Sequence, residues 1–157
     1  LYVEKPQGVV QAGDTVVVKV LLDTGTEEIN ALEGTISVSG DVVVDAVHTG
    51  GSIFTLWPVA PVYKNQQISF VGGTPSSIFG GKLHVFTVAL TPQKTGILTF
   101  DVSRLVGYLA DGSGTPVTKN KKKVTTVSVA EKIQNTRNDL KDALENDSTP
   151  PQKFAID

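Results

Sequence analysis

The side chains in this sequence that could catalyse a reaction or hold a metal ion are few and widely spaced. There are two histidines, His48 and His84, and no cysteine. Neither histidine has a second histidine or cysteine at a spacing typical of a zinc site, and each falls inside an expected strand. The absence of cysteine excludes disulfides, thiolate nucleophiles and cysteine-ligated zinc. We interpret both histidines as solvent-facing strand residues.

The acidic residues do not form a recognisable catalytic pair. Glu27 and Glu28 fall in an expected turn, while Asp41 and Asp45 flank an apolar strand. A glycosidase needs two carboxyl groups beside the scissile bond, and no aromatic cleft is indicated beside either pair. The Gly-x-Ser-x-Gly motif of serine hydrolases is also missing. We therefore expect that the protein is not an enzyme.

Two other stretches have a weaker chemical signature. The loop ADGSGT, residues 110–115, presents Asp111 and backbone carbonyls that could join a calcium shell. Calcium takes about six to eight oxygen ligands, commonly from several carboxylates, so a plain turn is the favoured interpretation. No cofactor is expected, and Asp111 is the one candidate calcium ligand. The basic run Lys119–Lys123 fits a binding site or the protection of a strand edge equally well.

Composition places the chain among ordinary globular domains. Its 157 residues are 39% hydrophobic and 19% charged, which suits a single domain with its own core. The formal net charge of −2 gives no general attraction to nucleic acid or to anionic membranes. No apolar run approaches the roughly 20 residues that span a bilayer. We therefore expect neither nucleic-acid binding nor membrane contact by this segment.

The elements that must position these residues are β-strands. From residue 1 to about residue 130, Val, Thr, Ile and Phe are frequent and are interrupted by Gly or Pro every few residues, as in strands joined by tight turns. Nine strands are expected, at residues 2–5, 15–22, 30–39, 42–49, 52–57, 67–71, 81–90, 97–104 and 123–129. Because no helix separates them, two packed antiparallel sheets are predicted.

Local patterns assign faces and ends to several of these strands. In residues 30–39 the apolar positions face inward and the polar positions outward, which contrasts Leu32, Ile36 and Val38 with Glu33, Thr35 and Ser37. Residues 15–22 are nearly all apolar, which is typical of a strand covered on both faces. Pro58 and Pro61 cannot donate ladder hydrogen bonds, so they are predicted to end the strand 52–57. The glycine-rich stretch 72–81 is predicted to be a loop.

The last part of the chain has a different character. From residue 131 onward charged and amide residues dominate, and Ile133, Leu140 and Leu144 fall on one thin stripe at helical spacing. The sequence DSTPP, residues 147–151, ends any such helix. We predict a domain over residues 1–130 and a helical or disordered connector over residues 131–157 that leads to a further module.

Several stretches, taken in order, carry a resemblance to a known family. They are AGDTVVVKVLLDTG (12–25), INALEGTISV (29–38), GGSIFTLWPVAP (50–61), ISFVGGTP (68–75) and the segment from residue 80 through 86 into 99–100. Together they resemble the cohesin family, in particular the cohesin-like domains of bacterial surface proteins. The resemblance implies a nine-stranded jelly-roll β-sandwich related to carbohydrate-binding modules. It also implies non-catalytic binding of a dockerin domain on one flat sheet face.

The resemblance further implies which strands build that face, namely 30–39, 52–57, 67–71 and 97–104. The outward positions on them are hydroxylated or charged: Glu33, Thr35, Ser37, Ser69, Thr99, Asp101 and Ser103. A solvated sheet face without any ligand explains the same alternation. The sequence indicates no hydrophobic anchor at the centre of this face, although protein interfaces usually contain one.

Three functions remain open at this point. The favoured one is an extracellular or cell-surface adhesion or assembly module, part of a larger anchored protein. Such a module would bind a protein partner, either dockerin-like or a second copy, through a sheet face or edge. The second is a carbohydrate-binding module that uses Trp57, Tyr63 and Phe79 as a platform, although Trp57 is better interpreted as a cover over the core. The third is a structural spacer in a surface or filament protein.

Overall fold

The computed structural model describes residues 1–117 and 123–133, and this part of the chain is built from strands. Among these residues no helix is long and apolar enough to cross a membrane. The strands are β1 (Tyr2–Glu4), β2 (Val10–Gln11), β3 (Val16–Leu22), β4 (Gly25–Ser39), β5 (Val42–His48), β6 (Leu56–Lys64), β7 (Gln67–Gly80), β8 (Leu83–Pro92), β9 (Gly96–Leu109) and β10 (Val124–Ala130).

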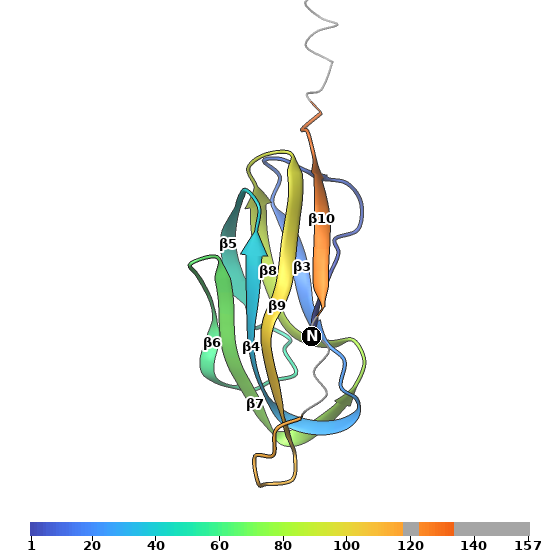
Figure 1. The fold of residues 1–157 in the computed structure, drawn as a ribbon, viewed down its shortest axis with the longest axis vertical. Helices are drawn as coiled ribbons and strands as arrows, with labels where there is room; N and C mark the ends of the chain where they lie inside the picture. Colours follow the sequence, from blue (N-terminus) through green and yellow to red (C-terminus); the bar gives the residue numbers. More distant parts are fainter. Residues whose placement is uncertain (118–122, 134–157) are drawn as a thin grey trace, which may run out of the picture.

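The strands form two sheets that pack face to face (Figure 1). One sheet has four strands in the order β1-β3-β8-β5, and the other has six in the order β2-β10-β9-β4-β7-β6. All pairings are antiparallel except that of the two-residue strand β2, which runs parallel to β10. The predicted all-β jelly-roll sandwich is thus confirmed, and β2 is a short strand that the sequence did not indicate.

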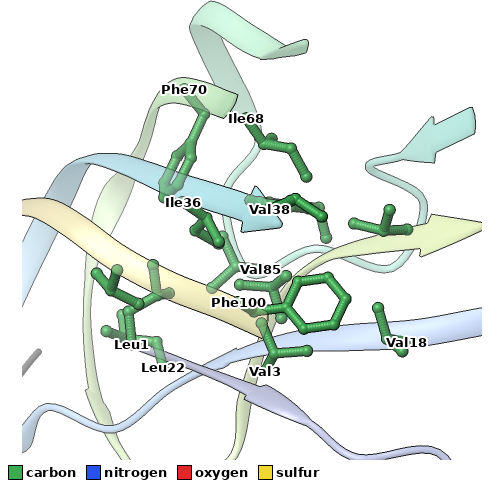
Figure 2. Close-up of a cluster of buried hydrophobic side chains, with 14 of the residues drawn as sticks. Leu1, Val3, Val18, Leu22, Ile36, Val38, Ile68, Phe70, Val85 and Phe100 are labelled. Carbon is green, nitrogen blue, oxygen red and sulfur yellow. The ribbon is translucent and has the colours of Figure 1, made fainter. Parts of the chain in front are cut away.

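The core lies between the sheets and follows from period-two alternation. Ile36 on β4 and Phe100 on β9 are at most 2% exposed and point toward the opposite sheet, Ile36 toward Val85 and Phe100 toward Val18 (Figure 2). Phe70 on β7 meets Phe86 on β8 across the two sheets, edge to face, with ring centroids 5.1 Å apart. Burying each such side chain contributes about 1.5–3 kcal/mol, so this layer holds the sheets together.

The structure corrects the prediction for the segment around the two prolines. The strand begins at Leu56 and continues as β6 to Lys64, through Pro58 and Pro61, which therefore do not end it. β6 is an edge strand that pairs only with β7, and its register shifts twice. An edge strand donates hydrogen bonds on one side only, so it tolerates proline where a central strand does not.

The stretch 72–81 is also not a loop, because all but its last residue belongs to β7. There it pairs with the first half of β4, with Gly73 opposite Ala31 and Ile78 opposite Ile29. Residues 27 and 28, expected in a turn, therefore lie in β4. Gly72 is required for packing, since a Cβ at this position would come within 2.9 Å of the ring of Trp57.

The expectation that the strand 15–22 is covered on both faces is wrong. In β3, Val17 is 56% exposed and Lys19 is also exposed, while Val18 and Val20 are buried. The outer face of β3 is therefore open to solvent at Val17 and Lys19.

Part of the predicted connector and of the basic run lies outside the described residues. Ile133 is 76% exposed, and the remainder of the thin apolar stripe, together with residues 119–122, is not described. The division of the chain at residue 130 remains a prediction.

Candidate functional site

The seven outward positions named from the sequence lie together on the outer face of the six-stranded sheet. Thr35 on β4 is opposite Ser69 on β7, and Ser37 is opposite Asp101 on β9. All seven residues are half-buried or exposed. They are Glu33, Thr35, Ser37, Ser69, Thr99, Asp101 and Ser103. The structure thus brings these residues onto one surface, and their role in binding a partner remains a prediction.

Short hydroxyl side chains form a connected row across the middle of this face. The hydroxyls of Thr35 and Ser69 lie 3.3 Å apart. Ser37 donates to the hydroxyl of Ser103 at 3.4 Å, and Ser103 donates to the backbone carbonyl of Thr35 at 3.2 Å. We call Thr35, Ser37, Ser69 and Ser103 the hydroxyl row. Because no long side chain rises from it, a partner backbone could approach the sheet closely here.

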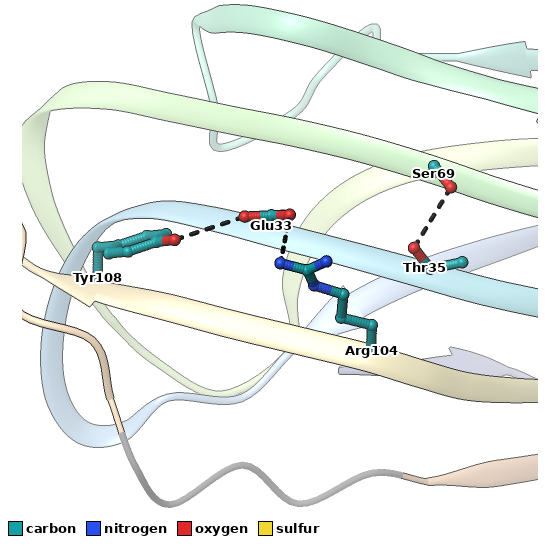
Figure 3. Close-up of polar contacts among 5 residues, drawn as sticks. All are labelled: Glu33, Thr35, Ser69, Arg104 and Tyr108. Carbon is teal, nitrogen blue, oxygen red and sulfur yellow. Dashed lines mark hydrogen bonds and ion pairs between the residues drawn. The ribbon is translucent and has the colours of Figure 1, made fainter.

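A charged cluster adjoins the hydroxyl row on the side of β9 (Figure 3). Arg104 places Nη2 3.0 Å from Oε1 of Glu33, and the hydroxyl of Tyr108 donates to Oε2 of Glu33 at 3.4 Å. Both carboxylate oxygens are therefore engaged and the charged groups are held in a defined orientation. The pair is well exposed to solvent, so it contributes at most about 1 kcal/mol to stability.

Arg104 and Tyr108 were not named among the site residues from the sequence. A register shift in β9 leaves Ser103 without a partner residue, so both Ser103 and Arg104 lie at the surface. A β-bulge of this kind breaks simple alternation. No feature of the sequence marks its position.

The edge strand β6 carries three exposed large hydrophobic side chains. Leu56, Val59 and Val62 are 55%, 48% and 57% exposed, and we call them the apolar ridge. Val59 is opposite Val71 on β7, and Val62 is opposite Ser69 of the hydroxyl row. The ridge therefore lies on the same face as the row and directly beside it. Its members are three residues apart because of the two register shifts, so a period-two search misses them.

The sequence indicated no hydrophobic anchor at the centre of this face. The apolar ridge lies at the edge of the face, on β6. The ridge was missed because the two prolines were taken as the end of a strand.

The aromatic residues considered as a carbohydrate platform do not share one surface. Trp57 is half-buried against the core and meets Phe54 and Phe70 edge to face, with centroids 5.9 and 6.5 Å apart. Tyr63 is opposite Ile68, near one end of β7, while Phe79 is near the other end and 63% exposed. At about 3.3 Å per residue, these two positions on β7 are roughly 35 Å apart along the strand. Sugar stacking on adjacent rings is not favoured by this arrangement.

His84 is hydrogen-bonded to neighbouring groups. His48 is exposed, as predicted, but His84 is half-buried. The ring of His84 lies 3.0 Å from the Gly51 carbonyl through Nδ1 and 2.9 Å from the Thr87 hydroxyl through Nε2. In the part of the chain that the structure describes, no three His, Cys, Asp or Glu side chains are placed to hold a metal ion.

The carboxylate of Asp111, the candidate calcium ligand, is bonded within its own loop. The hydroxyl of Thr115 donates to one oxygen and the amide of Ser113 to the other, the latter at 2.8 Å. Both bonds favour the ionised form, and the hydroxyl of Thr115 has the larger effect in lowering the pKa of Asp111. The loop is thus stabilised by its own hydrogen bonds.

Known proteins resemble this chain in fold and not in sequence. No protein-family profile and no curated protein sequence matches it. A cohesin module from the family 33 glycoside hydrolase of Clostridium perfringens is 12% identical; the match covers 83% of this chain and 96% of that one, with a TM-score of 0.65. For a non-cellulosomal cohesin from Archaeoglobus fulgidus the identity is 13%, the coverage 89% and 92%, and the TM-score 0.63.

A further match is the cohesin of a Coh-OlpA–Doc918 cohesin–dockerin complex from Clostridium thermocellum. It is 18% identical, the match covers 82% of this chain and 99% of that one, and the TM-score is 0.60. The fold of the described residues is therefore cohesin-like. The resemblance stated from the sequence is confirmed at the level of the fold.

Proposed function

We propose that this chain is a non-catalytic protein-binding module that acts outside the cell or at its surface. Its partner is dockerin-like, and it binds through the outer face of the six-stranded sheet. Structures with this fold include cohesins solved in complex with dockerins. The extracellular setting and the role in adhesion or assembly are part of the proposal, and they rest on the same likeness.

The observation that carries the proposal is the apolar ridge beside the hydroxyl row. Protein interfaces combine a buried apolar anchor with a polar surround that excludes water. Here Leu56, Val59 and Val62 supply the apolar contact, and the row and the Glu33–Arg104 cluster supply hydrogen-bonding groups next to it. A flat solvated face without a function has no need of a continuous line of exposed aliphatic side chains.

The opposite sheet offers a weaker surface for binding. Its two exposed valines, Val17 and Val43, lie on β3 and β5 and are separated by β8. They therefore do not form a continuous ridge. This contrast favours the six-stranded sheet as the binding face.

A charged double substitution on the ridge tests the proposal. Val59→Asp with Val62→Asp should weaken binding to a panel of dockerin domains at least 100-fold, since two carboxylates would be desolvated in the interface. Isothermal titration calorimetry gives the affinities. Fold retention is checked by the melting temperature and the fluorescence of Trp57.

Val43→Asp is the matched control, because Val43 is 48% exposed on an edge strand, as Val59 is. This variant should bind as the parent chain does. Equal effects of the two changes, or binding unaffected by the ridge variant, would show that the partner uses another surface.

Binding between copies of this chain is the alternative form of the proposal. In that case sedimentation would show dimers of the parent chain and monomers of the ridge variant, and no dockerin would bind. A carbohydrate-binding module and a structural spacer remain predictions from the sequence. The separation of Trp57 and Tyr63 from Phe79 does not favour the carbohydrate-binding module.

A further inference from the structure

The free edge of β10 is a second surface, distinct from the proposed binding face. β10 pairs with β9 from Val124 to Val129, but β2 covers its other edge only at Val129 and Ala130. Among the described residues no strand pairs with the remainder of that edge. Four to five residues of β10 therefore have no neighbouring strand on one side.

The backbone groups at this edge point outward. The carbonyl of Ala130 accepts a hydrogen bond from the amide of Ala12 at 2.9 Å, so the carbonyl points toward β2 and away from β9. Backbone groups two residues apart along a strand point the same way. The N–H and C=O groups of Val124 and Thr126 consequently face the uncovered edge.

A groove of about 430 Å³ lies between β10 and the segment before β2, and it meets the uncovered edge from Thr126 to Ser128 (Figure 1 shows this segment beside β10). One side is β10 from Thr126 to Ala130. The other side consists of Lys5, Pro6, Gly8, Val9 and Val10. This wall cannot pair with β10 as a regular strand, because Pro6 has no N–H and Gly8 has a φ of 86°. Val9 is 77% exposed and gives the groove an apolar lip.

The charges around the open end of the groove favour an acidic ligand. Lys5 lies in the wall, and Lys123 directly precedes the open edge, with its ammonium 5.1 Å from the ring centroid of Tyr2. The nearest acidic neighbour of Lys5 in sequence, Glu4, is opposite Lys19 on β3. An anionic side chain beside Lys5 or Lys123 would therefore meet a positive charge, while Asp101 on β9 is opposite Val124.

We propose that this groove is a strand-addition site for an extended, acidic peptide segment of a partner protein. The segment would pair with the free N–H and C=O groups of β10, and an apolar side chain would contact Val9. Main-chain hydrogen bonds supply affinity in this mode, and the flanking side chains supply specificity. The proposal does not depend on the apolar ridge or on a dockerin partner.

The test uses the full chain labelled with ¹⁵N and the peptide acetyl-Glu-Val-Thr-Val-Thr-Glu-amide. At saturation the amides of Val124 and Thr126 should exchange with solvent at least tenfold more slowly than in the free chain. The largest chemical-shift changes should fall on Thr126 and Val9. The same peptide with N-methyl groups on alternate residues should not bind, because it cannot form the ladder on that side.

Two variants locate the site. Thr126→Pro removes the donor at the open edge but keeps the bonds to β9, so it should abolish binding. Lys5→Glu, which keeps the fold even if the proline variant does not, should weaken binding about three- to tenfold. Lys82→Glu, an exposed lysine outside the groove, is the matched control and should have no effect.

Several outcomes would overturn the proposal. One is the absence of binding at millimolar peptide, and another is equal binding of the N-methylated peptide. A third is protection of Val124 and Thr126 in the free chain by concentration-dependent dimers, which would assign the edge to a second copy. The Val59→Asp/Val62→Asp variant should bind the peptide normally, so failure of the ridge proposal and failure of this one are separable.

Discussion

Gly34 lies in the middle of β4 with its inward side covered by the ring of Phe70. A Cβ at this position would lie 2.6 Å from Cζ of Phe70, which is closer than two carbon atoms that are not bonded to each other approach. Phe70 has no room to move, since it is 1% exposed and packs against Phe86 at 5.1 Å. A single hydrogen atom in place of a methyl group thus permits the central aromatic contact between the sheets.

We therefore expect Gly34→Ala to lower the free energy of unfolding by about 1–3 kcal/mol, the usual cost of overpacking. Urea unfolding followed by the fluorescence of Trp57 measures the change. Gly73→Ala is the control, because the nearest atom to its Cβ, the carbonyl oxygen of Asn30, is 3.5 Å away. Similar losses in both variants would mean that strand propensity and not the Phe70 contact is responsible.

Asp111 gives a prediction about pH at the same scale. Its pKa is lowered first by the hydroxyl of Thr115 and then by the amide of Ser113. A carboxyl group with a lowered pKa stabilises the folded loop above its ordinary pKa, and this contribution is lost as the pH falls through the lowered value. The loop should therefore keep its order at neutral and mildly acidic pH and loosen only in strong acid.

Thr115→Val removes the hydrogen bond that has the larger effect on Asp111, so it should raise the pKa of Asp111 toward its ordinary value. A carboxyl ¹³C titration by NMR measures this pKa directly. Thr95→Val, in another exposed turn, should leave it unchanged. An unshifted pKa in Thr115→Val would show that the Ser113 amide alone holds the carboxylate.

Among the elements, β4 and β6 show what alternation reveals and what it does not. The assignment of Glu33 and Thr35 to the outer face and of Ile36 to the core is correct, because β4 keeps a strict period of two from Leu32 to Ser39. β6 has only one neighbour and two register shifts, so neither its prolines nor the spacing of Val59 and Val62 follows the pattern. The polar half of the candidate face could thus be predicted from the sequence, and the apolar half could not.

The charged cluster could not be predicted from the sequence, for a related reason. Arg104 joins the face through a bulge, and a bulge depends on the fit of two strands that are distant in sequence. The second half of β7 was missed because its glycines and proline are typical of loops. There the ladder with β4 overrides local propensity.

Thr125 on β10 provides a test of how the two sheets are joined at their edge. It is 5% exposed, and its hydroxyl donates to the carbonyl of Val3 on β1 at 3.1 Å, across the sandwich. Thr125→Val keeps the volume but removes the donor, so we expect a loss of about 1 kcal/mol in the free energy of unfolding. Thr125→Ser retains the hydroxyl and should lose less; the reverse order would indicate that packing of the methyl group matters more than the hydrogen bond.

At the scale of the whole molecule, the sandwich separates its surfaces by chemistry. The outer face of the six-stranded sheet combines the apolar ridge with short hydroxyl groups, and the free edge of β10 offers unpaired backbone groups beside lysines. The two proposals together assign this core two different recognition modes, side-chain docking on a face and strand addition at an edge.

The Asp111 loop allows a prediction of how the stability of the molecule responds to calcium. The two oxygens of Asp111 are bonded within the loop, and no cluster of three acidic or histidine side chains exists in residues 1–117 and 123–133. A ligand at 100 times its dissociation constant would add about 2.7 kcal/mol and raise the melting temperature by several degrees. We expect calcium chloride and EDTA to give melting temperatures within about 1 °C of each other by calorimetry, since a single carboxylate supplies too few of the roughly six to eight oxygen ligands that calcium takes. A rise of several degrees with calcium that disappears in Asp111→Asn would instead assign this loop as a metal site.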